Sequence, residues 1–288
     1  MAWPGAAHSL VLPDTSKHEG NSRRSALPTN EFRAMTSDLE TQRAHMQSDA
    51  TAAAEKVLSH DAQYARVEAE TRRNRPATDT AGRAFRVWLR APSVLGALFF
   101  ALVSALWRIL TPGSSPWEWV AVAGVLVGWP LLEWSAHRWI LHLRPRRIFG
   151  VLFDPYFAQR HRTHHQNPSY FPDVFLPFGV VVGAWFVFSG ALWLLKAPGF
   201  LIATFMLSMS IAACVYEWMH FMAHADFVPP GNWLKRVAER HRQHHYRNEQ
   251  AWFAFSVPAV DDVFGTGGHV RSVPRSSTTR TIGIPAQD

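Results

Sequence analysis

Ten of the 15 histidines in this 288-residue chain fall into four tight clusters between residues 137 and 245. The clusters have the patterns HxxxxH, HxxHH, HxxxH and HxxHH, and they are His137 and His142; His161, His164 and His165; His220 and His224; His241, His244 and His245. Neutral imidazole is the commonest nitrogen ligand for transition metals. Ten imidazoles can hold two metal ions, so the clusters predict a centre of two metals with these ten residues as ligands.

The spacing within each cluster predicts helices. Residues three and four apart share one face of an α-helix, so each triplet and the HxxxH pair should point one way. His137 and His142 are five residues apart, and a straight helix would separate them by about 140°. Either this helix is locally wound wider, as often occurs at functional sites, or the two histidines approach the site from different sides.

Two carboxylates lie one helical turn before a histidine cluster: Glu133 before His137, and Glu217 before His220. A histidine that binds a metal usually donates its other N–H to a carboxylate or a carbonyl. We predict that Glu133 and Glu217 orient ligand histidines in this way. Direct metal ligation, or simple burial at the end of a membrane helix, are the alternatives.

The histidines must be positioned by the long apolar segments that precede them. Four such segments cover residues 92–110, 117–135, 174–195 and 199–217. Each is about long enough to cross a bilayer, and tryptophans lie near their ends. Short links join them into two hairpins. We predict an all-α integral membrane protein with about four transmembrane helices and a His-rich helical cap that holds the dimetal centre.

The distribution of charge predicts the orientation in the membrane. The two short links carry one basic residue, Lys196, whereas residues 136–173 and the region after 217 are rich in arginine. The positive-inside rule therefore places both large segments, and all four clusters, in the cytoplasm. The sequence start shows no signal peptide pattern. We expect a multi-pass membrane protein with its active site and both termini on the cytoplasmic side.

Composition excludes several other classes of protein. The net charge of +7 is concentrated beside the apolar segments, so we expect no nucleic-acid partner. Cys214 is the single cysteine, which excludes an intrachain disulfide framework and a Cys-rich zinc site.

The two halves of the apolar region resemble each other. Glu-Trp precedes the first histidine of a pair at residues 133–134 and again at 217–218. The pattern Arg-His-Arg-x-His-His occurs at residues 160–165 and returns at 240–245. Each half is thus an apolar hairpin, a histidine pair and then a histidine triplet, which indicates two similar halves facing one site.

The four clusters, in this order around two apolar hairpins, resemble those of the fatty acid hydroxylase and sterol desaturase superfamily, and most of all the fatty acid 2-hydroxylases. Residues 241–253 and 262–266 are also similar to bacterial members. The resemblance covers about residues 93–267. It implies a membrane-bound non-haem di-iron oxygenase that uses O2 to hydroxylate a C–H bond of a lipid, with a fatty acyl chain as the expected substrate.

The resemblance also implies the cofactors and partners. Two iron ions would occupy the centre, and zinc would be an inactive substitute acquired on purification. Electrons would come from a separate electron-transfer protein, because the sequence shows no haem domain. The alternatives are a hydroxylase or desaturase that acts on a sterol or carotenoid, or a zinc-dependent membrane hydrolase. Chain length and carbon position stay open.

We therefore expect three regions. Residues 1–85 are polar and are expected to be disordered or surface-helical, with residues 31–74 as the candidate helix. Residues 86–270 form the membrane hydroxylase domain, and residues 271–288 a disordered tail. Residues 1–80 are expected to be dispensable for chemistry. The alternative is that 31–74 docks an electron donor or a second subunit.

Overall fold

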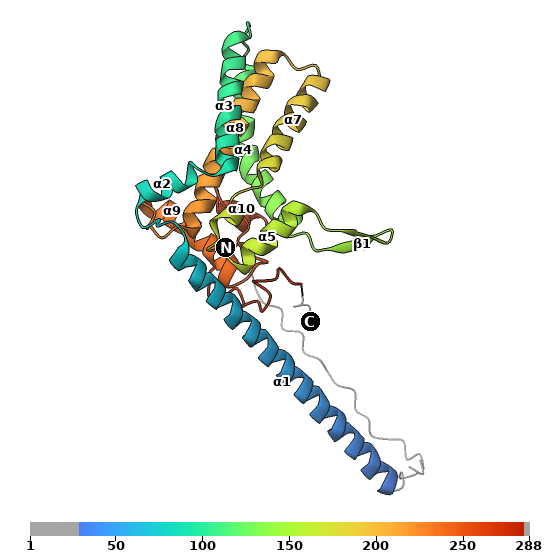
Figure 1. Ribbon diagram of the computed structural model, residues 1–288. Helices are drawn as coiled ribbons and strands as arrows, with labels where there is room; N and C mark the ends of the chain where they lie inside the picture. The colour runs from blue at the N-terminus through green and yellow to red at the C-terminus, as the bar shows by residue number, and fades with distance from the viewer. Residues whose placement is uncertain (1–28, 285–288) are drawn as a thin grey trace, which may run out of the picture. The chain divides into compact units, whose positions relative to one another are not determined.

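The computed structural model describes residues 29–284, which are almost entirely helical (Figure 1). In chain order the elements are α1 (Thr29–Asn74), α2 (Ala81–Trp88), α3 (Pro92–Leu110), α4 (Trp117–Ser135), the π-helix η1 (Ala136–Leu141), β1 (Arg146–Ile148), β2 (Val151–Phe153), α5 (Tyr156–Gln166), α6 (Phe171–Val174), α7 (Phe178–Leu194), α8 (Gly199–His224), α9 (Gly231–Tyr246) and α10 (Ala259–Val263). The all-α prediction is confirmed, apart from the short β1–β2 hairpin.

The chain divides into two compact units, residues 1–54 and residues 55–288. In the first unit the described residues belong to the N-terminal part of α1. The second unit contains the rest of α1 and every other element. The polar helix expected over 31–74 is present and begins at Thr29. Disorder is expected for residues 1–30, of which residues 1–28 lie outside the described residues.

Four helical stretches are long and apolar enough to cross a membrane: Pro92–Leu110, Trp117–Leu141, Phe171–Leu194 and Gly199–His224. They confirm the four predicted segments. Two of them extend past the expected ends at residues 135 and 217. In one, α4 passes directly into η1. In the other, α8 continues unbroken to His224, so the membrane helices themselves carry the two histidine pairs.

The two apolar hairpins pack together mainly through α8, which contacts both α3 and α4. Trp185 of α7 stacks on Phe100 of α3 with 4.9 Å between ring centroids. Near the link between α3 and α4, Arg108 Nε lies 2.6 Å from Glu118 Oε2. The same carboxylate accepts a hydrogen bond from the Thr204 hydroxyl of α8 at 2.5 Å. Polar contacts thus join the hairpins at the end remote from the histidines.

The remaining short helices lie together at the other end of α4 and α8 (Figure 1). There α9 packs on α8, α5 packs on η1, and α10 packs on α4. Pro155 and Pro230, both in extended backbone conformations, immediately precede α5 and α9. These helices form the predicted His-rich cap.

The segment after α10 differs from the expected disordered tail. Residues 271–284 are described, and they lie on the cap. Ile282 is buried, and Arg280 pairs with Glu68 of α1 at 2.7 Å. The Thr279 carbonyl accepts a hydrogen bond from His165 at 2.9 Å. The polar sequence did not predict this packing, because most of these contacts are made by backbone groups and one ion pair.

Candidate metal centre

The ten clustered histidines converge in two groups of five. In each group the potential ligand atoms all lie within 4.8 Å of one another. Group A consists of His137, His142, His161, His165 and His244, and group B of His164, His220, His224, His241 and His245. Nine of the ten side chains are 0 to 7% exposed. His142 is half-buried, with its Nδ1 atom buried. Each group could hold one metal ion.

Each triplet helix contributes to both groups. On α5, His161 and His165 belong to group A and His164 to group B. Residues four apart differ by about 40° around a helix, whereas His164 lies about 100° from His165. The i and i+4 histidines therefore share one group and the i+3 histidine faces the other. α9 repeats this arrangement, so the expectation that each triplet points one way is correct only for two of its members.

The π-helix η1 brings His137 and His142 together. The His142 N–H donates to the His137 carbonyl at 3.2 Å, a hydrogen bond over five residues. Wider winding places residues five apart on one face, and both side chains enter group A. Of the two alternatives left by the sequence, local widening is the one that the structure shows.

The ring nitrogens of different histidines lie so close together that ordinary hydrogen bonds cannot explain all of these contacts. His241 Nε2 lies 2.9 Å from His224 Nε2 and also 2.9 Å from His245 Nε2. A ring nitrogen carries either one proton or one lone pair, so it cannot donate to one neighbour and accept from the other. A cation shared by the three lone pairs resolves this conflict.

The same distances fit a coordination polyhedron. With metal–nitrogen bonds of about 2.0–2.1 Å, two ligands at right angles lie about 2.9 Å apart. In group A, His137 Nε2 and His161 Nε2 are 3.1 Å apart, and His142 Nε2 and His244 Nε2 are 3.2 Å apart. Within the described residues, both ring nitrogens of His164 are buried without a hydrogen-bond partner. The donor set therefore fits two transition-metal ions.

Burial keeps the imidazoles of the cap in the protonation state that a metal requires. Burial is the main cause that lowers the pKa of His164 and His245 well below the ordinary value, and neighbouring imidazoles lower it further. The pKa of His244 is lowered to about 4, again mainly by burial. These side chains are neutral at pH 7, and metal ligation needs neutral histidine.

Backbone carbonyls orient three of the group A histidines. His137 Nδ1 and His244 Nδ1 each lie 2.7 Å from a carbonyl, those of Phe253 and Ala251 respectively. His165 Nδ1 lies 2.9 Å from the Thr279 carbonyl. Such contacts fix the tautomer and leave Nε2 free for a metal. The sequence did not reveal these partners, because a carbonyl is common to every residue.

Two buried carboxylates hold the loop that supplies two of these carbonyls. Glu133 Oε1 accepts from the Phe255 and Ser256 N–H groups at 3.1 and 2.6 Å, and from the Ser256 hydroxyl at 2.7 Å. Asp261 accepts from the Phe253 N–H at 2.8 Å, and burial raises the pKa of Asp261. Glu133 is thus linked to His137 through the loop 251–256.

Glu217, on α8, also accepts a hydrogen bond from a backbone amide. Its Oε1 accepts from the Leu176 N–H at 3.1 Å, just before α7 begins. Among the described residues, neither Glu133 nor Glu217 is hydrogen-bonded to a histidine. Their predicted direct role in orienting ligand histidines stays a prediction.

Phe255 lies between the two groups. Its ring centroid is 4.7 Å from that of His137 in group A, and 4.8 and 4.7 Å from those of His220 and His241 in group B. The signal in the sequence for this residue is the aromatic run at 252–255, shortly after the last triplet. An apolar ring at this point shields both groups from water.

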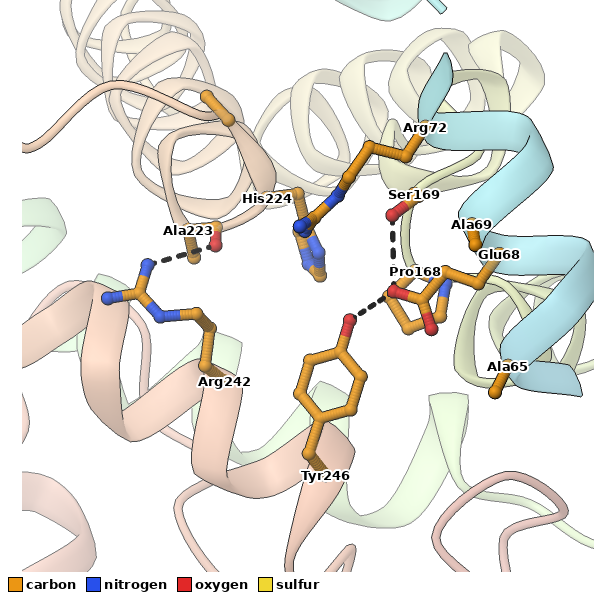
Figure 2. Close-up of a pocket in the computed structure, with 11 residues that line it drawn as sticks. Ala65, Glu68, Ala69, Arg72, Pro168, Ser169, Ala223, His224, Arg242 and Tyr246 are labelled. Atoms are coloured by element: carbon orange, nitrogen blue, oxygen red, sulfur yellow. Dashed lines mark hydrogen bonds between the residues drawn. The ribbon is translucent and has the colours of Figure 1, made fainter. Parts of the chain in front are cut away.

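The last turns of α1 cover the outer side of group B. A cavity of about 360 Å³ separates them from His224, Arg242 and Tyr246. Glu68 of α1 accepts hydrogen bonds from the Tyr246 hydroxyl at 2.5 Å and the Ser169 hydroxyl at 3.1 Å (Figure 2). The last turns of α1 therefore belong to the structure around the centre. Residues 1–80 were expected to be dispensable, and that expectation did not include these contacts.

Comparison with known proteins agrees with this geometry. The family model for fatty acid hydroxylase matches residues 122–266, which is 145 of 288 residues and contains all ten clustered histidines. The chain belongs to the fatty acid hydroxylase family. The family match begins within α4 and ends just after α10, so it includes α5, α6, α9 and α10 of the cap.

Curated relatives match the same part of the chain. Fatty acid 2-hydroxylase of Rattus norvegicus is 28% identical over 150 residues, which are 50% of this chain and 38% of that protein. Ceramide very long chain fatty acid hydroxylase SCS7 of Saccharomyces cerevisiae is 28% identical over 146 residues, 50% of this chain and 36% of that protein. The chain spans less than half the length of these relatives.

A solved structure of full-length scs7p, with only the hydroxylase domain visible, is similar in fold. Its TM-score is 0.50 at 22% sequence identity, over 69% of this chain and 70% of that chain. The arrangement of membrane helices and cap thus occurs in a second member of this fold.

Proposed function

We propose that this protein hydroxylates a C–H bond of a fatty acyl chain, with O2 as co-substrate and two iron ions as cofactors. One oxygen atom of O2 enters the C–H bond as a hydroxyl group. The other leaves as water, which requires two electrons from a separate electron-transfer protein and two protons from the solvent. The observation that carries this proposal is the pair of adjacent five-imidazole groups within a family named for hydroxylation.

The ten histidines of groups A and B would hold the metals, five ligands to each. Imidazole suits iron, copper, nickel and zinc alike, so the donor set supports several metals. Iron is proposed because, when bound, it supplies the oxidation of an unactivated C–H bond. Zinc has no redox chemistry and would give an inactive form.

The chain's own residues would position the lipid and exclude water. An apolar cavity of about 320 Å³ runs between α4 and α8 and is lined by Val125, Ile211, Met219 and Ser256, among others. Ser256 follows Phe255, whose ring contacts both histidine groups. An acyl chain in this groove would lie beside the centre without leaving the membrane-spanning region.

The structure gives less support to a zinc-dependent hydrolase. Such an enzyme needs a general base close to its metal-bound water. The sequence suggests Glu133 and Glu217 for this role, because they precede ligand histidines by one helical turn. In the structure both carboxylates accept hydrogen bonds from backbone amides instead. Five imidazoles per group also exceed the three protein ligands of a typical catalytic zinc site.

The test is isotopic. The full chain in lipid nanodiscs is loaded with Fe(II) without oxygen, then given a reductant, 18O2 and a defined fatty acyl lipid. Mass spectrometry should find one 18O atom in a hydroxyl group on the acyl chain. A parallel incubation with a sterol tests the alternative substrate class. If 18O appears in the sterol and not in the acyl lipid, the substrate is a sterol and the proposed acyl substrate is wrong.

The matched control is the zinc-loaded protein, which should bind metal equally and form no labelled product. Hydrolysis by the zinc form, with no oxygenation by the iron form, would contradict the proposed reaction.

A further inference from the structure

The tip of the β1–β2 hairpin places an aromatic residue where the backbone disfavours it. Phe149 and Gly150 form the two-residue turn between Ile148 and Val151, with φ of 51° and 82°. Turns with positive φ at both central residues favour Asn-Gly or Gly-Gly. A bulky residue at positive φ is a true outlier. Phe149 is also 102% exposed, so no packing among the described residues compensates the strain.

The apolar character continues along the hairpin. Val151 and Leu152 are 71% and 60% exposed, and because neighbouring strand residues point to opposite faces, both faces are apolar. An isolated two-stranded hairpin is marginally stable in water, and exposed apolar strand edges promote aggregation. The hairpin therefore requires an apolar cover.

Its position in the chain identifies that cover. Residues 142–145 separate the hairpin from the end of the span Trp117–Leu141. Five Cα steps reach at most about 18 Å. Arg162 of α5 fixes the base of the hairpin through the Leu143 carbonyl at 3.0 Å and the Asp154 carboxylate at 2.6 Å. In Figure 1 the hairpin projects sideways near the cap end of the four candidate membrane helices. This is the end at which those helices would leave a membrane.

Charge points to anionic lipid. Arg144, Arg146 and Arg147 are exposed, and within the described residues none of them has a carboxylate partner. Basic residues beside a membrane are attracted to anionic headgroups. Apolar side chains flanked by arginine are typical of segments that enter the boundary between headgroups and acyl chains.

We propose that the hairpin 146–153 inserts Phe149 into the surface of the membrane that the long helices cross, with its arginines on anionic headgroups. Because Arg162 joins the hairpin base to α5, this contact would tether the helix that carries His161, His164 and His165 to the bilayer. The proposal does not depend on the reaction catalysed.

The test uses the full chain in nanodiscs, with Cys214→Ala removing the single native cysteine. An environment-sensitive dye is attached at Val151→Cys, which leaves Phe149 in place, or at Gln250→Cys as a control on an exposed turn of the cap. Lipids that carry a quencher at the headgroup–acyl boundary should quench the dye at 151 and leave the dye at 250 unchanged. Equal access of water to both dyes would overturn the proposal and indicate a surface that faces a soluble protein.

Three substitutions separate insertion from folding. Phe149→Asn suits the turn, so the chain should fold normally while a dye at Val151→Cys loses its quenching. Arg146→Gln and Arg147→Gln should each weaken insertion about fivefold in bilayers with phosphatidylserine, and have little effect in phosphatidylcholine alone. Unchanged quenching in the Asn variant would show that the aromatic tip is not the anchor.

Discussion

His164 and His244 are exchanged between the two halves of the molecule. His164 is in the first half and lies in group B, where the other four histidines come from the second half. His244 is in the second half and lies in group A, with four histidines of the first half. Neither half therefore completes a five-histidine group alone, and the two groups are coupled through α5 and α9.

This exchange predicts how single substitutions affect metal content. His164→Ala should weaken group B and His244→Ala group A, so each should reduce bound metal from about two ions per chain toward one. Turnover should fall by about 100-fold or more, since even changes beyond the ligands cost 10–100-fold. Elemental analysis of purified protein measures the first effect.

His45→Ala supplies the control for these variants, because His45 is an exposed histidine outside both groups. It should leave metal content and turnover unchanged. Full metal content in the His164 variant would contradict the two-group arrangement, as would at most one tightly bound ion in the unaltered protein.

Glu133→Ala should loosen the loop that orients His137. The substitution leaves two buried N–H groups and one hydroxyl without an acceptor, each costing about 1–3 kcal/mol. We expect a lower melting temperature, together with metal affinity reduced by about 10–100-fold. Glu133→Gln keeps an acceptor oxygen and should lose much less of both. Equal losses in the two variants would mean that the charge, rather than the loop, is what matters.

Two truncations of the N-terminus, one within α1 and one beyond its C-terminal end, should give different results. A chain that begins at Glu55 keeps Glu68, with its bonds to Tyr246 and Arg280, and also Arg75, whose guanidinium lies 2.5 Å from Asp226. It should retain its metal and its melting temperature. A chain that begins at Ala81 loses these contacts and should melt at a lower temperature with less bound metal.

Point substitutions refine that comparison. Glu68→Ala should reproduce part of the loss, and Glu70→Ala, on the exposed side of the same helix, should not. If the chain from Ala81 keeps its metal and loses turnover only with its native electron donor, residues 55–80 act in docking instead.

The proposed orientation can be tested by labelling intact cells. In the Cys214→Ala background, an impermeant thiol reagent should reach Ser114→Cys and miss Gln250→Cys. Ser114 lies in the exposed link between α3 and α4, and Gln250 is exposed on the cap. Gln250 is the better probe than Ser169, which is buried under α1. Labelling at 250 with none at 114 would reverse the assignment.

The sequence predicted the features that depend on local spacing. Hydropathy located four spans, two of which end six and seven residues later than expected. The i, i+3 and i+4 pattern identified the histidine triplets that the structure brings together. The loop 251–256 and the Thr279 carbonyl were not predictable in this way, because their role rests on backbone groups brought together by packing. Glu133 was identified as important, yet its partners lie more than 120 residues away.

The π-helix at Ala136–Leu141 makes the register of this segment more important than its composition. Deleting one residue there would restore ordinary winding and turn His142 by about 100° relative to His137. Many side-chain changes between these two histidines should be tolerated, while a change of length should not. Searches for metal-binding helices that assume a spacing of three or four residues will therefore miss this pair, and designers who borrow the cap must copy the extra residue with it.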